Sequence, residues 1–147
     1  MNRIFVEAIE ASPVIGAVKS MDGLKRCLAS DVGVVFILFG DICNIGDIVD
    51  QVKASGKLAM VHMDLIVGLS AKEIAVDFIK KYTVADGIIT TKPALVRRAK
   101  ELKLYTVQRF FVIDSLAFET IGRQIGTARP DVIEVLPGLM PKVIRRL

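Results

Sequence analysis

The stretch that decides the fold is Val34-Val35-Phe36-Ile37-Leu38-Phe39-Gly40-Asp41, an apolar run that stops at a glycine and a carboxylate. A helix-like stretch follows it, at about residues 46–54. Continuous runs of β-branched and aromatic residues are typical of strands that are buried on both faces of a parallel sheet. The stretch therefore predicts one β/α unit whose strand ends at a polar side chain.

The same unit recurs six times along the chain. Strands are expected at residues 14–18, 34–39, 57–63, 86–90, 105–113 and 131–136. They stop at Lys19, Asp41, His62 with Asp64, Thr90 to Lys92, Gln108 with Arg109, and Glu134. This alternation predicts an α/β fold, either an open doubly wound sheet or a TIM-barrel-like (β/α) repeat. No Gly-x-Gly-x-x-Gly follows the first strand, which disfavours a classical dinucleotide-binding domain.

Helices are expected between the strands and at both ends of the chain. The expected segments begin at Asn2 and cover about residues 21–28, 46–54, 71–82, 93–103, 115–124 and 140–147. The spacing of Ser70 and Glu73 predicts a capping box at the start of the fourth of these helices. Six units are too few for a closed eight-stranded barrel, so we expect an apparently incomplete, C-terminally short one.

Length and composition predict one barrel-like domain over residues 1–147, with 52% hydrophobic residues. The longest apolar run is too short to span a bilayer, and the N-terminus has no signal-peptide pattern, so we expect a cytoplasmic protein without a membrane partner. Cys27 and Cys43 lack a metal-ligand spacing and His62 is the only histidine. The sequence therefore predicts reduced thiols and no metal site.

Positive charge is concentrated in the second part of the chain. Residues 1–91 hold 9 Lys and Arg against 11 Asp and Glu, whereas residues 92–147 hold 11 against 5. Clustered positive charge is typical of nucleic-acid binding, because Lys and Arg displace counterions from phosphates. A solvated helix face gives the same pattern, and the sequence leaves both interpretations open.

The polar stops also predict a ligand site, because ligands of parallel α/β folds bind beyond the carboxyl ends of the strands. Thr90, Thr91 and Lys92 stand where a strand gives way to a helix and could hold an anion. The alternative is a capping threonine with a lysine that faces solvent. Lys19 could neutralise a phosphate or, if desolvated, act as a Schiff-base nucleophile. His62 and Asp64 are expected on one face of a strand end, either as an acid–base pair or with a structural histidine.

Two later stops extend this site. Gln108 and Arg109 must face opposite sides of their strand, so that only one reaches the mouth of the barrel. A guanidinium there would suit phosphate or carboxylate recognition. Glu134 lies inside a strand, where an unpaired carboxylate is costly, so a basic partner is expected and Lys19 is a candidate.

Together these segments resemble one known family, and the resemblance covers essentially the whole chain. The matching segments are Pro13–Lys19, Phe39–Ile42, Val61–Leu65 with Gly68-Leu69, Asp86–Lys92, Gln108–Ser115, and Glu134–Gly138 with Pro141-Lys142. They are similar to the glycerol-3-phosphate-responsive antiterminators, the glycerol uptake operon antiterminator regulatory proteins. The resemblance implies a TIM-barrel-like regulator, not an enzyme, that binds leader mRNA of glycerol-utilisation genes with glycerol 3-phosphate as effector and without a cofactor.

The resemblance also implies that Lys19, His62, Asp64, Lys92, Arg109 and Glu134 occupy recurrent polar positions of the family. With Asp41 and Thr91, which stand at strand ends, they form the predicted ligand-binding set. Family members resemble full barrels, and phosphate-binding barrels usually hold the phosphate after their last two strands. We therefore expect either a shortened relative or an anion held instead by Lys19, Lys92 and Arg109. The alternatives are a barrel lyase, aldolase or isomerase acting on a small phosphorylated substrate, and a scaffold that only forms a homodimer through its open sheet edge.

Overall fold

The computed structural model describes residues 3–11, 14–111 and 115–136, and for residues 115–118 it describes the backbone only. Its elements alternate along the chain and agree closely with the predicted units. They are α1 (Arg3–Ala11), β1 (Gly16–Val18), α2 (Met21–Leu28), β2 (Val34–Ile37), α3 (Ile45–Ala54), β3 (Leu58–His62), α4 (Glu73–Tyr82), β4 (Gly87–Thr90), α5 (Pro93–Glu101), β5 (Tyr105–Phe111), α6 (Ser115–Ala128) and β6 (Val132–Leu136).

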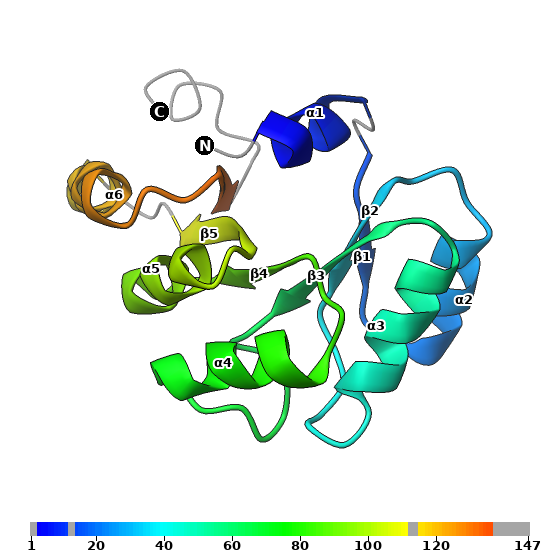
Figure 1. Cartoon of the computed structure of the whole chain (residues 1–147). Coiled ribbons are helices and arrows are strands. Elements are labelled where there is room, and N and C mark those ends of the chain that lie inside the picture. The colour runs from blue at the N-terminus through cyan, green and yellow to red at the C-terminus, as the bar shows by residue number, and fades with distance from the viewer. Residues whose placement is uncertain (1–2, 12–13, 112–114, 137–147) are drawn as a thin grey trace.

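The six strands form one parallel sheet in the order β1-β2-β3-β4-β5-β6. Each strand pairs in parallel with the next one in the chain. The segment between them, which contains a helix, returns the chain to the amino ends of the strands before the next strand begins. The sheet is curled, and helices α2 to α5 pack on its outer face (Figure 1). Among the described residues β1 pairs only with β2 and β6 only with β5, so this part of the chain is a half-barrel with two open edges.

Alternate residues of each strand serve two separate cores. In β2, Val35 and Ile37 pack outward against the helices α2 to α5. Val34 and Phe36 pack on the concave face with inward residues of the neighbouring strands. Because both faces are covered, all four residues of this strand are buried, as the continuous apolar run predicts.

Helix α1 lies on the opposite side of the sheet from α2 to α5 (Figure 1). Its Phe5 is fully buried and stacks on Tyr105 at the start of β5, with ring centroids 4.8 Å apart. The helix therefore covers the concave face near the amino ends of the strands. The polar stops lie at the other ends of the same strands.

Two aspartates secure the amino ends of the strands. Asp86 accepts hydrogen bonds from the Ala59 amide at 2.8 Å and from the Lys53 ammonium at 2.9 and 3.0 Å. Asp131 accepts from the amide of Thr106 at 2.9 Å. These carboxylates each join a strand to its neighbour, and they are remote from the candidate site.

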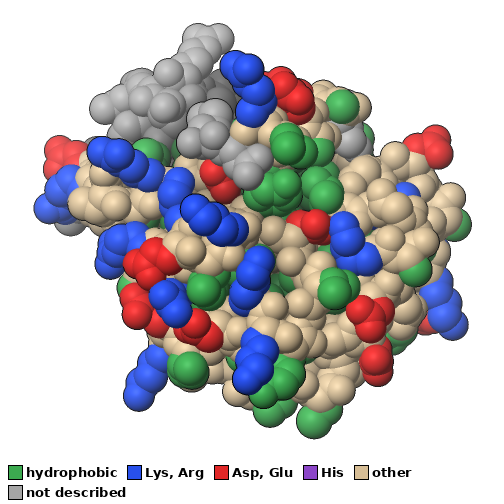
Figure 2. All heavy atoms as spheres, viewed as in Figure 1, with side chains coloured by type: hydrophobic (Ala, Val, Ile, Leu, Met, Phe, Trp, Pro, Cys, Tyr) green, Lys and Arg blue, Asp and Glu red, His purple; other side chains and the backbone are tan. Residues whose placement is uncertain are grey.

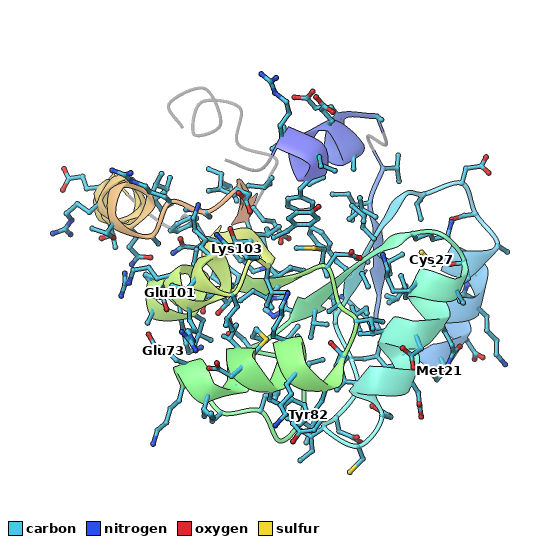
Figure 3. All side chains as sticks on the ribbon, in the orientation of Figure 1. Met21, Cys27, Glu73, Tyr82, Glu101 and Lys103 are labelled. Atoms are coloured by element: carbon cyan, nitrogen blue, oxygen red, sulfur yellow. The ribbon has the colours of Figure 1, made fainter. Side chains whose placement is uncertain are left out.

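The structure corrects the predicted start of α4. The helix begins at Glu73 instead of after a capping box at Ser70. The Ser70 hydroxyl accepts a hydrogen bond from the amide of Lys72, two residues on, which holds a turn before the helix. In Figure 3, Glu73 and Tyr82 mark the two ends of α4, and Glu101 marks the end of α5. The expected helix over 140–147 and the N-terminal cap at Asn2 lie outside the described residues.

Candidate functional site

The predicted site residues separate into a pair of groups and two single positions. Asp64, Thr91 and Lys92 meet where the loops after β3 and β4 touch. His62, Arg109 and Glu134 occupy inward positions near the carboxyl ends of β3, β5 and β6. Lys19 and Asp41 stand apart, after β1 and β2.

Asp64 is the centre of the loop group. One carboxylate oxygen accepts from the Thr90 hydroxyl at 2.9 Å and from the Lys92 ammonium at 3.3 Å. The other accepts from the Thr91 amide at 2.9 Å and from the Thr91 hydroxyl at 2.8 Å. Burial alone raises the pKa of Asp64, but these hydrogen bonds and the Lys92 charge outweigh it and lower the pKa below its ordinary value. This ionised carboxylate orders the start of α5.

Lys92 belongs to the same group but stays open to solvent. Its side chain is 41% exposed while its ammonium rests against Asp64. The Lys92 amide donates to the Thr90 hydroxyl at 3.1 Å. Thr90 was considered with Thr91 and Lys92 but left out of the predicted ligand-binding set, and the structure shows that its hydroxyl joins Asp64 to the Lys92 amide.

The expectation that His62 and Asp64 share one face of a strand end is wrong, and neither the acid–base pair nor a loop carbonyl at the imidazole is found among the described residues. Strand β3 ends at His62, so Asp64 lies in the following turn and the alternation of strand faces does not apply to it. All four donors to Asp64 come from Thr90, Thr91 and Lys92. An acid–base pair between the imidazole and this carboxylate is therefore absent from the described site.

His62 is the most unusual residue of the concave group. It is 2% exposed, and neither ring nitrogen has a hydrogen-bond partner among the described residues. Burial lowers the pKa of His62 and the positive charge of Arg109 lowers it further, while the carboxylates of Asp64 and Glu134 act in the opposite direction. The imidazole is therefore neutral at pH 7, with one donor and one acceptor unused.

Arg109 and Glu134 form a two-pronged ion pair across β5 and β6. The Nε and Nη2 atoms of Arg109 donate to the Glu134 carboxylate at 3.2 and 3.0 Å. The two side chains are 14% and 26% exposed, respectively. The parallel register places these residues directly opposite each other.

Lys19 was the wrong partner to predict for Glu134. It follows β1, at the opposite edge of an open sheet, so it cannot reach β6 as it could in a closed barrel. Lys19 is exposed, and no ion pair of the described chain involves it. Gln108, whose direction the sequence left open, points outward and donates to Gln124 of α6 at 3.0 Å. Arg109 is thus the member of the dipeptide that reaches the mouth.

Asp41 has a local structural role. Its carboxylate accepts from the amides of Cys43 and Asn44 at 2.8 and 3.0 Å, and its carbonyl accepts from the Ile45 amide at 2.9 Å. These bonds set the start of α3. A short bridge to Val67 joins this loop to the loop after β3, so Asp41 shapes the rim of the site.

A comparison with known families assigns the chain. The model of the glycerol-3-phosphate responsive antiterminators matches residues 14–147. The chain belongs to this family. All eight predicted site residues fall within the matched region.

Solved structures of similar proteins support the fold. A glycerol uptake operon antiterminator regulatory protein from Listeria monocytogenes is 31% identical and superposes with a TM-score of 0.85, over 90% of this chain and 74% of that one. A glycerol uptake operon antiterminator-related protein from Thermotoga maritima is 42% identical with a TM-score of 0.79, over 90% and 75%. An uncharacterized Escherichia coli protein, YgcP, is 40% identical over 92% of this chain and 71% of its own length.

Three further observations concern metal ligands, thiols and membrane spans in the described part of the chain. No three His, Cys, Asp or Glu side chains of the described ranges gather as ligands for a metal ion. Cys27 and Cys43 are both free thiols. None of the helices described is long and apolar enough to cross a bilayer.

Proposed function

We propose that this chain is a glycerol-3-phosphate-responsive regulator that acts on the leader mRNA of glycerol-utilisation genes and prevents premature termination of transcription. The observation that carries the proposal is the family match over residues 14–147. The polar groups at the carboxyl ends of β3 to β6 support it, because they offer a small ligand both charge and hydrogen bonds at the usual ligand end of parallel strands.

The arrangement of charge favours an anion at the rim of this site. Lys92 has a partly exposed ammonium at the start of α5, and Lys19 has an exposed one after β1. The guanidinium of Arg109 is already neutralised by Glu134. We therefore assign the phosphate of the ligand to Lys92, with Thr91 at the same helix start.

The environment of the lysines speaks against the competing enzyme. A Schiff-base amine is activated by desolvation or by a neighbouring cation. Lys19 is exposed, and Lys92 is 41% exposed and paired with a carboxylate. A scaffold without a ligand is also disfavoured, since His62 would then keep two buried nitrogens unpaired within the described site.

Binding of mRNA is assigned to the basic second part of the chain. Figure 2 shows Lys and Arg side chains over α5 and its neighbours, with acidic side chains between them. Arg98 is held by Asp77 at 2.6 Å and by Glu101 at 2.7 Å, so its charge is compensated. Arg97 and Lys103, both exposed, are the better candidates for phosphate contacts.

Calorimetric titration with glycerol 3-phosphate tests the ligand. Binding of a leader mRNA hairpin, measured by fluorescence anisotropy across a salt series with and without the ligand, tests the regulator. We expect saturable heat, and RNA binding that depends on both ligand and salt. The double variant Arg97→Gln/Lys103→Gln should lower the salt slope by about 2, while Arg98→Gln serves as a matched control.

The opposite results are equally informative. No heat with glycerol 3-phosphate, and RNA binding that ignores it, would reject the regulator. Trapping of a phosphorylated carbonyl substrate on Lys19 or Lys92 by borohydride would favour the enzyme instead. Light scattering with and without ligand would test the homodimer, which stays a prediction.

A further inference from the structure

We propose that His62 and the Arg109–Glu134 pair form a separate subsite that recognises the hydroxyl groups of the ligand and determines its specificity for a polyol phosphate. This inference rests on the proposed function, because it assumes that a small phosphorylated molecule binds at the carboxyl ends of the strands. It adds a division of labour. Lys92 at the rim holds the phosphate, and the concave group binds the hydroxyl groups of the carbon chain.

The first argument is the unmet hydrogen-bonding capacity of His62. The side chain is 2% exposed, yet both ring nitrogens lack a partner among the described residues. A buried polar group without a partner is costly, and native structures rarely keep one without a reason. A neutral imidazole offers one donor and one acceptor, which point away from each other in the plane of the ring. Two ligand hydroxyl groups, one at each nitrogen, would satisfy the ring.

The second argument is the charge of the neighbouring pair. Arg109 spends Nε and Nη2 on Glu134, and its Nη1 group remains as a further donor. Each Glu134 oxygen retains acceptor capacity beyond the bond it already makes. The pair is electrically neutral as a unit but still rich in donors and acceptors. Such a surface suits uncharged hydroxyl groups.

The same charges disfavour a phosphate at this position. A dianion placed beside His62 would meet a neutral imidazole, a guanidinium already paired, and the carboxylate of Glu134. The ionised carboxylate of Asp64 also acts on His62. Repulsion from carboxylates in a partly buried site is weakly screened by water. The phosphate is therefore better placed at the rim beside Lys92, whose side chain is 41% exposed.

The third argument is the apolar surroundings of His62. In the register of the sheet, His62 of β3 lies opposite Ile89 of β4, and Ile89 lies opposite Val107 of β5. Ile89 and Val107 are fully buried members of the concave core. Their side chains cannot hydrogen-bond to the imidazole, which leaves its donor and its acceptor to a ligand.

The test compares two ligands that share a phosphate and differ in one hydroxyl. Glycerol 3-phosphate and 3-hydroxypropyl phosphate, which lacks the central hydroxyl, are titrated calorimetrically into the whole chain. We expect the first to bind at least about tenfold more tightly, because the second leaves a buried polar group unpaired. In His62→Leu the ratio of the two dissociation constants should fall to about 1. In Lys92→Gln both affinities should fall while the ratio persists.

The outcomes separate this inference from the proposed function. If the wild-type chain binds neither phosphate, both fail. If it binds glycerol 3-phosphate but His62→Leu keeps the tenfold ratio, the subsite alone is rejected. His62→Gln, which retains a donor and an acceptor, guards against a variant that does not fold. His62→Gln should keep part of the ratio. If both His62→Gln and His62→Leu keep the wild-type ratio, the assignment is overturned.

Discussion

An apolar side chain at the position of His62 would make the folded protein more stable than the buried imidazole does. His62 sits at the end of β3, buried, beside an ion pair whose arginine depresses its basicity. Buried groups of this kind are enriched at functional sites, where stability is exchanged for recognition. The residue-scale predictions concern this imidazole and the pair next to it.

Replacing His62 by Leu should leave the free energy of unfolding at pH 7 equal or higher, because an unpaired polar group is removed. It should also remove a pH dependence. The pKa of His62 is lowered from 6.5 in the folded state, so the unfolded chain takes up the proton first. Its contribution is complete above about pH 6.5 and is lost as the pH falls toward the folded value, by up to about 1.4 kcal/mol per pH unit.

Urea unfolding of both chains between pH 5 and pH 8 measures this difference. Arg109, Asp64 and Glu134 are the charged groups that act on the imidazole, and they are present in both chains. Parallel stability curves for His62→Leu and the wild type would contradict the prediction.

Replacing one partner of the Arg109–Glu134 pair should lower the free energy of unfolding more than replacing both partners. Arg109→Leu leaves the Glu134 carboxylate without its partner and should lower the free energy of unfolding by about 2 kcal/mol. That is less than for a fully buried pair, because the side chains are 14% and 26% exposed. The double variant Arg109→Leu/Glu134→Leu should recover most of the loss. A double-mutant cycle in urea tests this, and additive losses would refute it.

At the scale of elements, the candidate site depends on two loops that hold each other. Asp64, from the loop after β3, binds three consecutive residues at the start of the β4–α5 connection. The loop after β2 is tied to the same region by the Asp41–Val67 bridge. The position of Lys92 is therefore set by side chains that are distant in the sequence.

Asp64→Asn should loosen this connection. An amide accepts fewer hydrogen bonds than a carboxylate and brings its own donors against the Thr91 and Lys92 donors, so we expect a loss of about 2 kcal/mol. Hydrogen exchange at the Thr91 amide should accelerate. Asp77→Asn is the control and should change stability little, because the Asp77 side chain is partly exposed and solvent screens its pair with Arg98. Equal exchange rates in wild type and Asp64→Asn would be the contrary result.

The same carboxylate predicts an acid-sensitive contribution. The pKa of Asp64 is lowered from 3.8, so its contribution to stability is present above that value and is lost as the pH falls through the lower folded value. Asp64→Asn should lack this fall in acid.

The contact between β4 and its neighbours also allows a sharp test. A Cβ added at Gly87 would collide with the Tyr105 carbonyl oxygen and would lie 2.7 Å from the Met60 Cε. Gly87→Ala should therefore cost about 1–3 kcal/mol. Gly122→Ala, in α6 with nothing within 4 Å, should instead raise stability by about 0.5–1 kcal/mol. Thermal melts of the two variants should shift in opposite directions, and a shift of equal sign would refute the packing argument.

At the scale of the whole molecule, the half-barrel needs a cover for its concave face, and α1 supplies part of it. Phe5 is fully buried against Tyr105, while the adjacent Ile4 is 69% exposed. The chain spans 71% to 75% of the length of the relatives described above. Within the described residues, α1 closes the amino end and leaves polar groups at the carboxyl end.

Phe5→Ala should therefore cost about 3–5 kcal/mol, as for other buried aromatic side chains, and should expose the concave core. Ile4→Ala on the same helix should change the free energy of unfolding little. Urea unfolding, together with binding of a hydrophobic dye, measures both effects. A similar small loss in both variants would show that α1 does not cover this core.

The sequence by itself determined the order and type of the elements, because burial on both faces of a parallel strand writes a continuous apolar run into the chain. Strand ends moved by a few residues at most, as in β2, where Leu38 and Phe39 fall beyond the strand. The sequence also showed where each strand meets a polar side chain, and through those segments it indicated the family.

Only the tertiary structure decided which of those side chains meet. Glu134 pairs with Arg109 instead of Lys19. The register of β5 and β6 places Arg109 opposite Glu134, and the open sheet places β1 at the other edge from β6. Asp64 binds Thr90, Thr91 and Lys92 instead of His62, because β3 ends at His62 and the alternation of strand faces does not extend to Asp64. Periodicity along one strand is a local property of the chain, whereas partners across strands depend on the three-dimensional arrangement. Among the described residues, that arrangement leaves both ring nitrogens of His62 without a hydrogen-bond partner.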